Sequence, residues 1–165
     1  MLSVRGPSMQ TLASTPTCSH ARFAVTSTKP TEFIDLTARI QSLVADSGID
    51  VGFVNIQTLH TTTAIVVNEG EPLLLSDFAT QLERAAPRDR HYRHDDLIAR
   101  TVNITAEERV NGHAHCRALL LPTSACLNVC EGTVMLGMWQ RVFLVELDGP
   151  RVRHVSVLVA GEGRR

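Results

Sequence analysis

Turn residues divide the second half of the chain into short segments rich in aliphatic and β-branched residues, and this pattern limits the fold more than any other feature. The segments are "HCRALLL", "SACLNV", "TVMLGMWQRVFLVEL" and "RVRHVSVLVA". They are separated by Pro122, by Glu131-Gly132 and by Asp148-Gly149-Pro150, which are typical of turns. Short connections join antiparallel strands. The second half therefore predicts an antiparallel sheet, with a bulge at Gly137.

The first half predicts further strands and two helices. Residues 20–28, 51–59 and 63–68 alternate or are β-branched, as strands are. Apolar residues from Phe33 to Val44 recur at helical spacing, with Asp35 or Thr37 as the cap and Gly48 just beyond the end.

A second helix is predicted over residues 72–86, with Pro72 in its first turn and Pro87 after its end. Two helices and about seven hairpin-connected strands predict an α+β fold with packed, mostly antiparallel sheets. The length of 165 residues suits one domain, placed at residues 19–165. Residues 1–18 are expected to be a disordered N-terminal extension.

The composition argues against several classes of partner. The net charge is −1 and the arginines are scattered, so no nucleic acid or anionic membrane surface is expected as a partner. No apolar run approaches the roughly 20 residues that span a bilayer. Because the N-terminus lacks the apolar core of a signal peptide, we expect a cytoplasmic protein with reduced cysteines. Cys126 and Cys130 are interpreted as small buried side chains.

Histidines gather near a long polar stretch, residues 87–112, of the length at which a loop is usually functional or disordered. His94 and Asp95-Asp96 lie within it, His60 follows a predicted strand, and His113 and His115 begin the next one. Three such ligands and an open position suit catalytic zinc. No local ligand spacing supports a metal, so histidines satisfied in the core or at the surface are the alternative.

Other polar residues stand at strand ends. Glu69, after Asn68, is either a general base or part of a turn. Thr61, Thr62 and Ser124 offer donors to a phosphate, or are ordinary turn residues. Trp139, beside Gln140, is either a substrate platform or a core residue. A six-residue strand is about 20 Å long, so His60 and Glu69 are not expected to meet unless the chain bends or a neighbouring subunit supplies one of them.

Taken in order, "HTTTAIVVNE", "YRHDD", "NGHAHCRALLL", "LGMWQRVFLVELDGPRVR" and "AGEG" resemble the YjbQ-like proteins, also called the secondary thiamine-phosphate synthase enzyme family. The resemblance spans residues 20–163. It implies a homotrimer with a histidine-lined pocket near a subunit boundary. Pro122-Thr123-Ser124 departs from the Gly-x-Ser usual in the family. The site residues that the resemblance implies are His60, Asn68, Glu69, His94, His115, Trp139, Gln140 and Arg153.

The resemblance implies an enzyme, a transferase with weak thiamine-phosphate synthase activity. It would join a hydroxymethylpyrimidine pyrophosphate to a thiazole phosphate, with His60, His94 and His115 holding a divalent metal, most naturally zinc. Two alternatives stay open. One is a metal-dependent hydrolase of a small phosphorylated or cyclic substrate, with Glu69 as base. The other is a trimeric protein that binds a small anion without catalysis.

Overall fold

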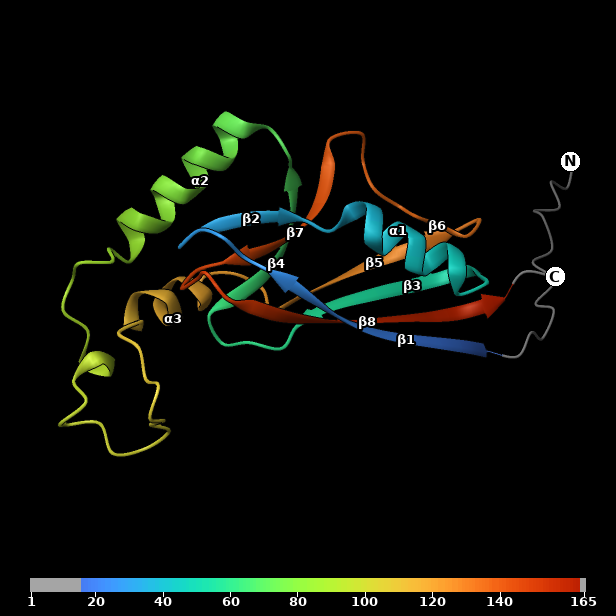
Figure 1. The fold of residues 1–165 in the computed structure, drawn as a ribbon. Coiled ribbons are helices and arrows are strands. Elements are labelled where there is room, and N and C mark those ends of the chain that lie inside the picture. The colour runs from blue at the N-terminus through green and yellow to red at the C-terminus, as the bar shows by residue number, and fades with distance from the viewer. Residues whose placement is uncertain (1–15, 164–165) are drawn as a thin grey trace, which may run out of the picture.

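The structure is a computed structural model that describes residues 16–163, in which eight strands, three α-helices and one short 3-10 helix are found (Figure 1). In chain order these are β1 (Pro16–Thr26), β2 (Glu32–Asp35), α1 (Thr37–Asp46), β3 (Ile49–Thr58), β4 (Thr63–Glu69), α2 (Pro72–Ala85), η1 (Arg93–Asp95), α3 (Gly112–Ala118), β5 (Ser124–Cys130), β6 (Thr133–Val134), β7 (Gln140–Glu146) and β8 (Val152–Gly163).

The strands form two antiparallel sheets, which confirms the predicted α+β class. The five-stranded sheet has the order β1-β8-β3-β5-β6, and the three-stranded sheet has the order β2-β7-β4. Every paired strand is antiparallel to its neighbour. Within residues 16–163 no helix is long and apolar enough to cross a membrane.

Strand β7 is buried on both faces and separates two apolar cores. Val142 and Leu144 pack with α1 and the inner face of the five-stranded sheet, whereas Phe143 and Val145 pack with Leu82 of α2 and Ala114 of α3. A strand with two buried faces is apolar throughout rather than alternating. The run "VFLVEL" is of this kind.

Helix α3 corrects the prediction for residues 115–121, which were expected to form a strand. The carboxylate of Asp95 accepts hydrogen bonds from the backbone N–H groups of Asn111 and Gly112, at 3.0 and 2.8 Å, and so caps the helix from the preceding loop. Gly112 packs against Tyr92, because a Cβ at Gly112 would lie 2.5 Å from the Cβ of Tyr92. These contacts come from distant residues, so local strand propensity did not reveal the helix.

The long strand predicted over residues 133–147 is also corrected, because it is interrupted. Strand β6 ends at Val134 and β7 starts at Gln140, and the intervening loop projects from the sheets (Figure 1). Gln140 Oε1 accepts the N–H of Gly137 at 2.8 Å and closes this loop. Gly137 therefore lies in a loop and not in a bulge.

Smaller differences concern the ends of elements. Phe33 lies in β2 rather than in the first helix, which starts at Thr37 and is followed by Gly48 at a φ of 70°. Strand β1 starts at Pro16, so residues 16–18 belong to the sheet, and residues 1–15 of the expected extension lie outside the described residues. Cys126 and Cys130 are exposed, not buried as interpreted.

A buried ion pair between Glu146 and Arg153 joins the two sheets. Arg153 Nε donates to Glu146 Oε2 at 2.6 Å and Nη2 donates to Oε1 at 2.5 Å, with both side chains almost completely buried. Oε1 also accepts the backbone N–H groups of residues 147–149. Despite the cost of burial, these donors lower the pKa of Glu146 to about 2.

We expect Glu146→Gln to lower the free energy of unfolding at pH 7 by about 3–5 kcal/mol, because it leaves the Arg153 charge buried without a counter-charge. Glu162→Gln, at an exposed position of the same strand as Arg153, is the control. The measurement is urea denaturation followed by circular dichroism.

The difference in the free energy of unfolding between wild type and Glu146→Gln should also depend on pH. The pKa of Glu146 is lowered from 4.5 to about 2, so its stabilisation is complete above 4.5 and is lost as the pH falls towards 2. The gap between wild type and Glu146→Gln should therefore narrow over that window. A gap at pH 7 below about 1 kcal/mol, the size usual for a surface pair, would contradict the assignment.

Candidate functional site

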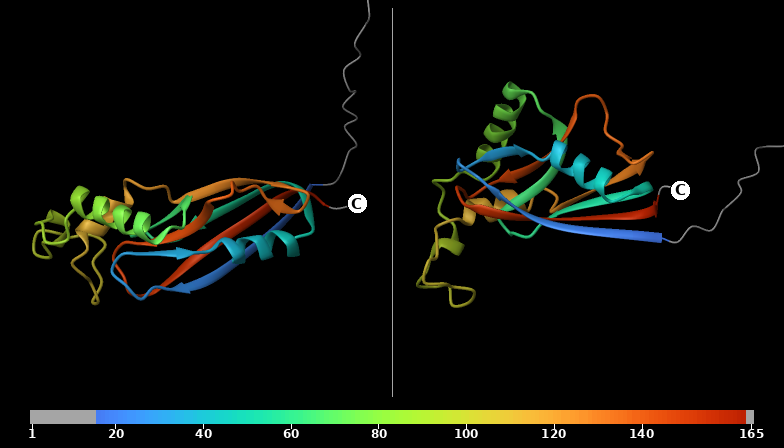
Figure 2. Two further views of the ribbon diagram at one scale, coloured as in Figure 1. Left: turned by 90° about the horizontal axis from the view of Figure 1, so that it is seen from above. Right: turned by 45° about the vertical axis from the view of Figure 1, so that its right-hand side comes forward.

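A polar cavity of about 490 Å³ lies beside the start of β4, and we call it the histidine cavity. Its walls come from residues 59–62, the segment that contains η1, helix α3 and the turn before β8. Figure 2 shows that the segment that contains η1 extends beyond the ends of the sheets. Six predicted site residues line the cavity: His60, Thr61, Thr62, His94, His115 and Arg153.

His60 is held against strand β8. Its Nε2 accepts the backbone N–H of His154 at 2.7 Å, so the proton of the neutral ring is on Nδ1. The two imidazoles stack with centroids 5.8 Å apart. Burial and the nearby charge of Arg153 lower the pKa of His60, so the ring is neutral at pH 7.

His94 and His115 contact each other edge to face in the wall of the cavity, with ring centroids 4.6 Å apart. Burial lowers the pKa of His115, and the proximity of His94 lowers it further. Nη1 of Arg100 lies 3.3 Å from His94 Nε2 and 2.6 Å from Glu108 Oε1. The cavity therefore has a neutral His115 near a paired arginine.

His113, predicted to share a strand face with His115, lies instead on helix α3. Residues two apart in a helix point in different directions. His113 is buried, its Nε2 has no partner within the described residues, and it does not line the histidine cavity. Burial also lowers its pKa.

Each arginine of the cavity wall has a carboxylate partner. Besides the Arg100–Glu108 and Arg153–Glu146 pairs, Arg151 Nη2 lies 2.9 Å from Asp148 Oδ2. Arg153 Nη2 also donates to Thr62 Oγ1 at 3.0 Å. The carboxylates in and behind this wall are therefore occupied by the arginines.

The three histidines do not form a ready metal site. Within residues 16–163, no three or more His, Cys, Asp and Glu side chains are arranged to hold a metal ion. Nε2 of His60 faces a backbone donor and Nε2 of His94 faces a guanidinium. An ion would have to take the other ring nitrogens or displace these donors. Zinc binding stays a prediction.

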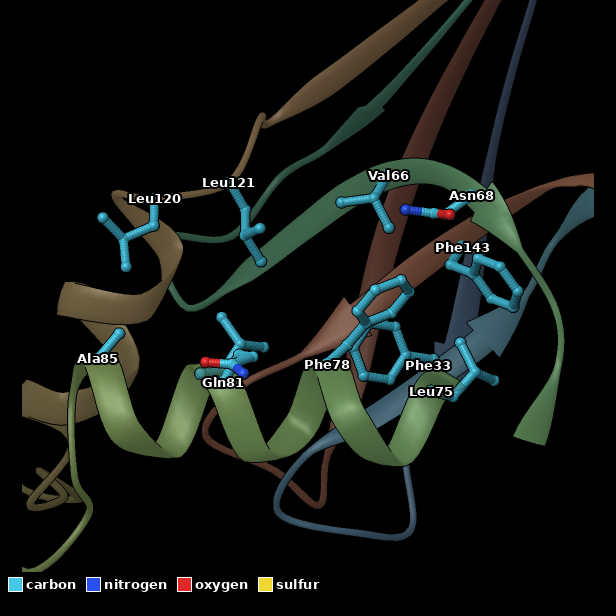
Figure 3. A pocket seen from close by; sticks show the side chains of 11 residues that line it. Phe33, Val66, Asn68, Leu75, Phe78, Gln81, Ala85, Leu120, Leu121 and Phe143 are labelled. Atoms are coloured by element: carbon cyan, nitrogen blue, oxygen red, sulfur yellow. The ribbon is translucent and has the colours of Figure 1, made fainter. Parts of the chain in front are cut away.

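The remaining predicted site residues lie elsewhere. Glu69 and Trp139 line a separate hollow of about 360 Å³ at the far end of β4, and Gln140 starts β7 beside it. Asn68 lines an apolar groove of about 410 Å³ between α2 and the three-stranded sheet. The side chains of Phe33, Phe78 and Phe143 also line this groove (Figure 3). Ser124 starts β5 and does not line the histidine cavity.

Sequence reasoning missed Arg100, Glu108 and Asn111 as cavity residues, although it selected the polar stretch 87–112 as a whole. Asn111 is buried and donates from Nδ2 to Asp148 Oδ2 at 3.3 Å, and its Oδ1 has no partner in the described part of the chain. The sequence did contain a signal for the buried ion pair of Glu146. A single carboxylate inside the apolar run "VFLVEL" is buried with the run, and a buried carboxylate requires a charged or hydrogen-bonding partner.

Comparisons with known proteins agree with this architecture. Residues 21–162 match the family described as UPF0047 protein YjbQ-like. A UPF0047 protein of Methanothermobacter thermautotrophicus is 39% identical over 131 residues, which are 79% of this chain and 84% of that protein. The protein YugU of Bacillus subtilis is 27% identical over 83% of this chain and 96% of its own length.

Solved structures show the same fold. A YbjQ-like protein of unknown function from Sulfolobus solfataricus has a TM-score of 0.81 at 33% identity, over 90% of this chain and 100% of that one. A hypothetical protein from Aeropyrum pernix has a TM-score of 0.77 at 30% identity, over 87% and 99%. The chain therefore belongs to the UPF0047 family of YjbQ-like proteins.

Proposed function

We propose that the histidine cavity is the active site of a transferase that acts on a small phosphorylated substrate. The observation that carries the proposal is that His60, His94 and His115 share one cavity with Arg100 and Arg151. A neutral imidazole can donate and accept a proton at neutral pH. The cavity volume is within the range of small-molecule sites.

The specific reaction that we propose is a weak thiamine-phosphate synthase activity. The ring nitrogen of a thiazole phosphate attacks the exocyclic methylene carbon of hydroxymethylpyrimidine pyrophosphate, and a C–N bond forms. The C–O bond to pyrophosphate breaks, and its electron pair leaves with the pyrophosphate. No proton transfer is needed for the balance, so the protein's task is to stabilise the charge that develops on the leaving oxygen.

The cavity residues suit this task. The guanidinium of Arg151 is partly exposed and salt-bridged to Asp148 through one nitrogen, which leaves other N–H groups for a phosphate. Thr61 lines the cavity and is exposed, so its hydroxyl is an additional donor. We assign His115 the N–H donated to the leaving oxygen. Arg153 has a different task, because its pair with Glu146 positions Thr62 and the strand that carries His154.

The proposal requires uncharged histidines at neutral pH. We expect His60 and His115 to titrate below the ordinary value of 6.5, because burial disfavours the imidazolium form. Imidazole NMR signals followed from pH 8 to pH 4, and assigned with His60→Gln and His115→Gln, measure this. Titration of either ring at or above 6.5 would contradict the assignment.

The lowered pKa values of His60 and His115 also determine how the stability of the fold changes with pH. Since the folded pKa values lie below 6.5, the unfolded chain binds protons more readily, and these rings reduce stability as the pH falls below 6.5.

His115→Ala should lower kcat for the synthase reaction by about 10²-fold while KM changes little, because it removes the N–H group that stabilises the leaving oxygen mainly in the transition state. His91→Ala is the matched control, since His91 is exposed and does not line the cavity. Pyrophosphate release from the two purified substrates is the assay.

The pyrophosphate-release assay, combined with the melting temperature in the presence of pyrophosphate, distinguishes three cases. Equal rates for His115→Ala and wild type would remove His115 from the mechanism. No turnover by wild type, with pyrophosphate still raising its melting temperature, would favour an anion-binding protein. No turnover and no stabilisation would reject the cavity as a phosphate site.

A further inference from the structure

A second polar hollow adjoins the histidine cavity, and we call it the loop hollow. It has a volume of about 430 Å³ and lies in the segment around η1 that projects beyond the sheets (Figure 2). His94, Arg100 and Asn103 line both hollows, so these three residues form the boundary between them. Arg93 and Asp96 line the loop hollow but not the histidine cavity. Molecules bound in the two hollows would therefore meet at this boundary.

Arg100 is committed to holding the boundary in place. Its Nη1 donates to Glu108 Oε1 at 2.6 Å and faces His94 Nε2 at 3.3 Å. Its Nε donates to the carbonyl of Val102 at 3.2 Å, and its Nη2 donates to the carbonyl of Asn103. A guanidinium has five N–H groups. Most of those on Arg100 are used within its own loop, so Arg100 shapes the wall and offers few donors to a ligand.

The guanidinium of Arg93 is in the opposite situation. Arg93 is exposed, and no hydrogen bond or ion pair within residues 16–163 involves its side chain. All five of its N–H groups therefore remain for a ligand. A guanidinium pairs with a phosphate through two parallel N–H bonds, which gives both strength and orientation.

The carboxylate in the lining, that of Asp96, is already engaged. Its Oδ1 accepts the backbone N–H groups of Ile98 and Ala99, at 3.1 and 3.0 Å. The bonds from Ala99 and Ile98 lower the pKa of Asp96, and His91 and Arg93 lower it further. Asp96 thus organises a turn and does not form an ion pair with Arg93 within the described residues. The loop hollow consequently offers a ligand unused donors on a cation, which suits an anionic group.

The proposed reaction requires two separate regions that bind anions. One substrate carries a pyrophosphate and the other a phosphate, and the two groups repel each other unless each has its own cation. In the histidine cavity, Arg151 is partly exposed and has N–H groups left, whereas Arg153 is buried with Glu146. Arg151 can serve the pyrophosphate, so the second phosphate needs another cation. Arg93, on the other side of His94, has the unused donors for it.

We propose that the loop hollow is a second phosphate subsite, in which Arg93 binds the phosphate of the thiazole phosphate. This inference rests on the proposed function, because that reaction brings a second phosphorylated molecule to the protein. The thiazole ring extends past His94 into the histidine cavity, where the pyrimidine pyrophosphate is bound. The attacking ring nitrogen then approaches from the side of His94, and the pyrophosphate leaves on the side of Arg151. Attack and departure on opposite sides of the carbon are what a displacement requires.

Isothermal titration calorimetry with the thiazole phosphate and with its dephosphorylated alcohol tests the subsite without turnover. Wild type should bind the phosphate more tightly than the alcohol. Arg93→Gln should weaken binding of the phosphate by about 10-fold or more, and binding of the alcohol by less than about twofold, because it removes a charged hydrogen-bond donor that only the phosphate uses. Arg90→Gln is the matched control, since Arg90 is exposed and lines neither hollow.

Each outcome of the titration decides the inference. Equal affinity of wild type for the phosphate and the alcohol, or no binding of the phosphate, would overturn it. So would an Arg93→Gln variant that binds the phosphate as wild type does, or that loses both ligands equally. A phosphate preference that depends on Arg93, without any release of pyrophosphate, supports the subsite and counts against the proposed reaction. Turnover that is insensitive to Arg93→Gln keeps the reaction and rejects the subsite.

Steady-state kinetics then separate the two subsites. Arg93→Gln should raise KM for the thiazole phosphate by about 10-fold and KM for the pyrimidine pyrophosphate by less than about twofold. Arg151→Lys should show the reverse, because lysine keeps the charge beside Asp148 but lacks the fork that holds a phosphate by two bonds. An equal rise of both KM values in Arg93→Gln would show that the loop hollow does not bind one substrate separately, and would overturn the inference.

Discussion

The buried pair of Glu146 and Arg153 connects most parts of this fold. Glu146 ends β7 in the three-stranded sheet, and Arg153 is the second residue of β8 in the five-stranded sheet. The carboxylate also accepts the Ser27 hydroxyl at 2.9 Å and the N–H groups of the following turn. A buried charge is tolerable only when its partners replace the lost water. The Ser27 hydroxyl, three backbone N–H groups and the Arg153 guanidinium fulfil this condition for Glu146, and the ion pair links the two sheets.

The same strand β8 then determines where the cavity forms. Arg153 points inward and bonds Thr62, while the backbone N–H of the next residue, His154, bonds His60. One side chain and the neighbouring backbone N–H of the same strand thereby hold the segment that precedes β4. On the opposite wall, Asp95 caps α3 and so fixes His115 relative to His94, one residue before Asp95. His60, His94 and His115 line one cavity because the bond from β8 holds the segment of His60 and the Asp95 cap holds the segments of His94 and His115.

Residue patterns predicted α2 and the strands β3, β4, β5 and β8, because burial on one or both faces leaves a periodic or continuous apolar signal. They missed β2 and merged β6 with β7. They were insufficient for α3, whose helical state depends on a carboxylate from η1 and on packing of Gly112 against Tyr92. They singled out His60, His94, His113 and His115. The structure places His60, His94 and His115 in one cavity, and the roles of these residues stay predictions. Arg100 and Glu108 escaped because a salt bridge within a long loop leaves no periodic trace in sequence.

The two ends of strand β4 have opposite physical characters. One end is a polar hollow whose carboxylates are all paired, and the other is an apolar surface with a partly exposed Glu69. Strand β4 pairs with β7 without a register shift and stays extended between them, so the two ends lie about 20 Å apart. Within one chain the carboxylate of Glu69 therefore does not reach the histidine cavity, whose arginines already pair with Glu108, Asp148 and Glu146.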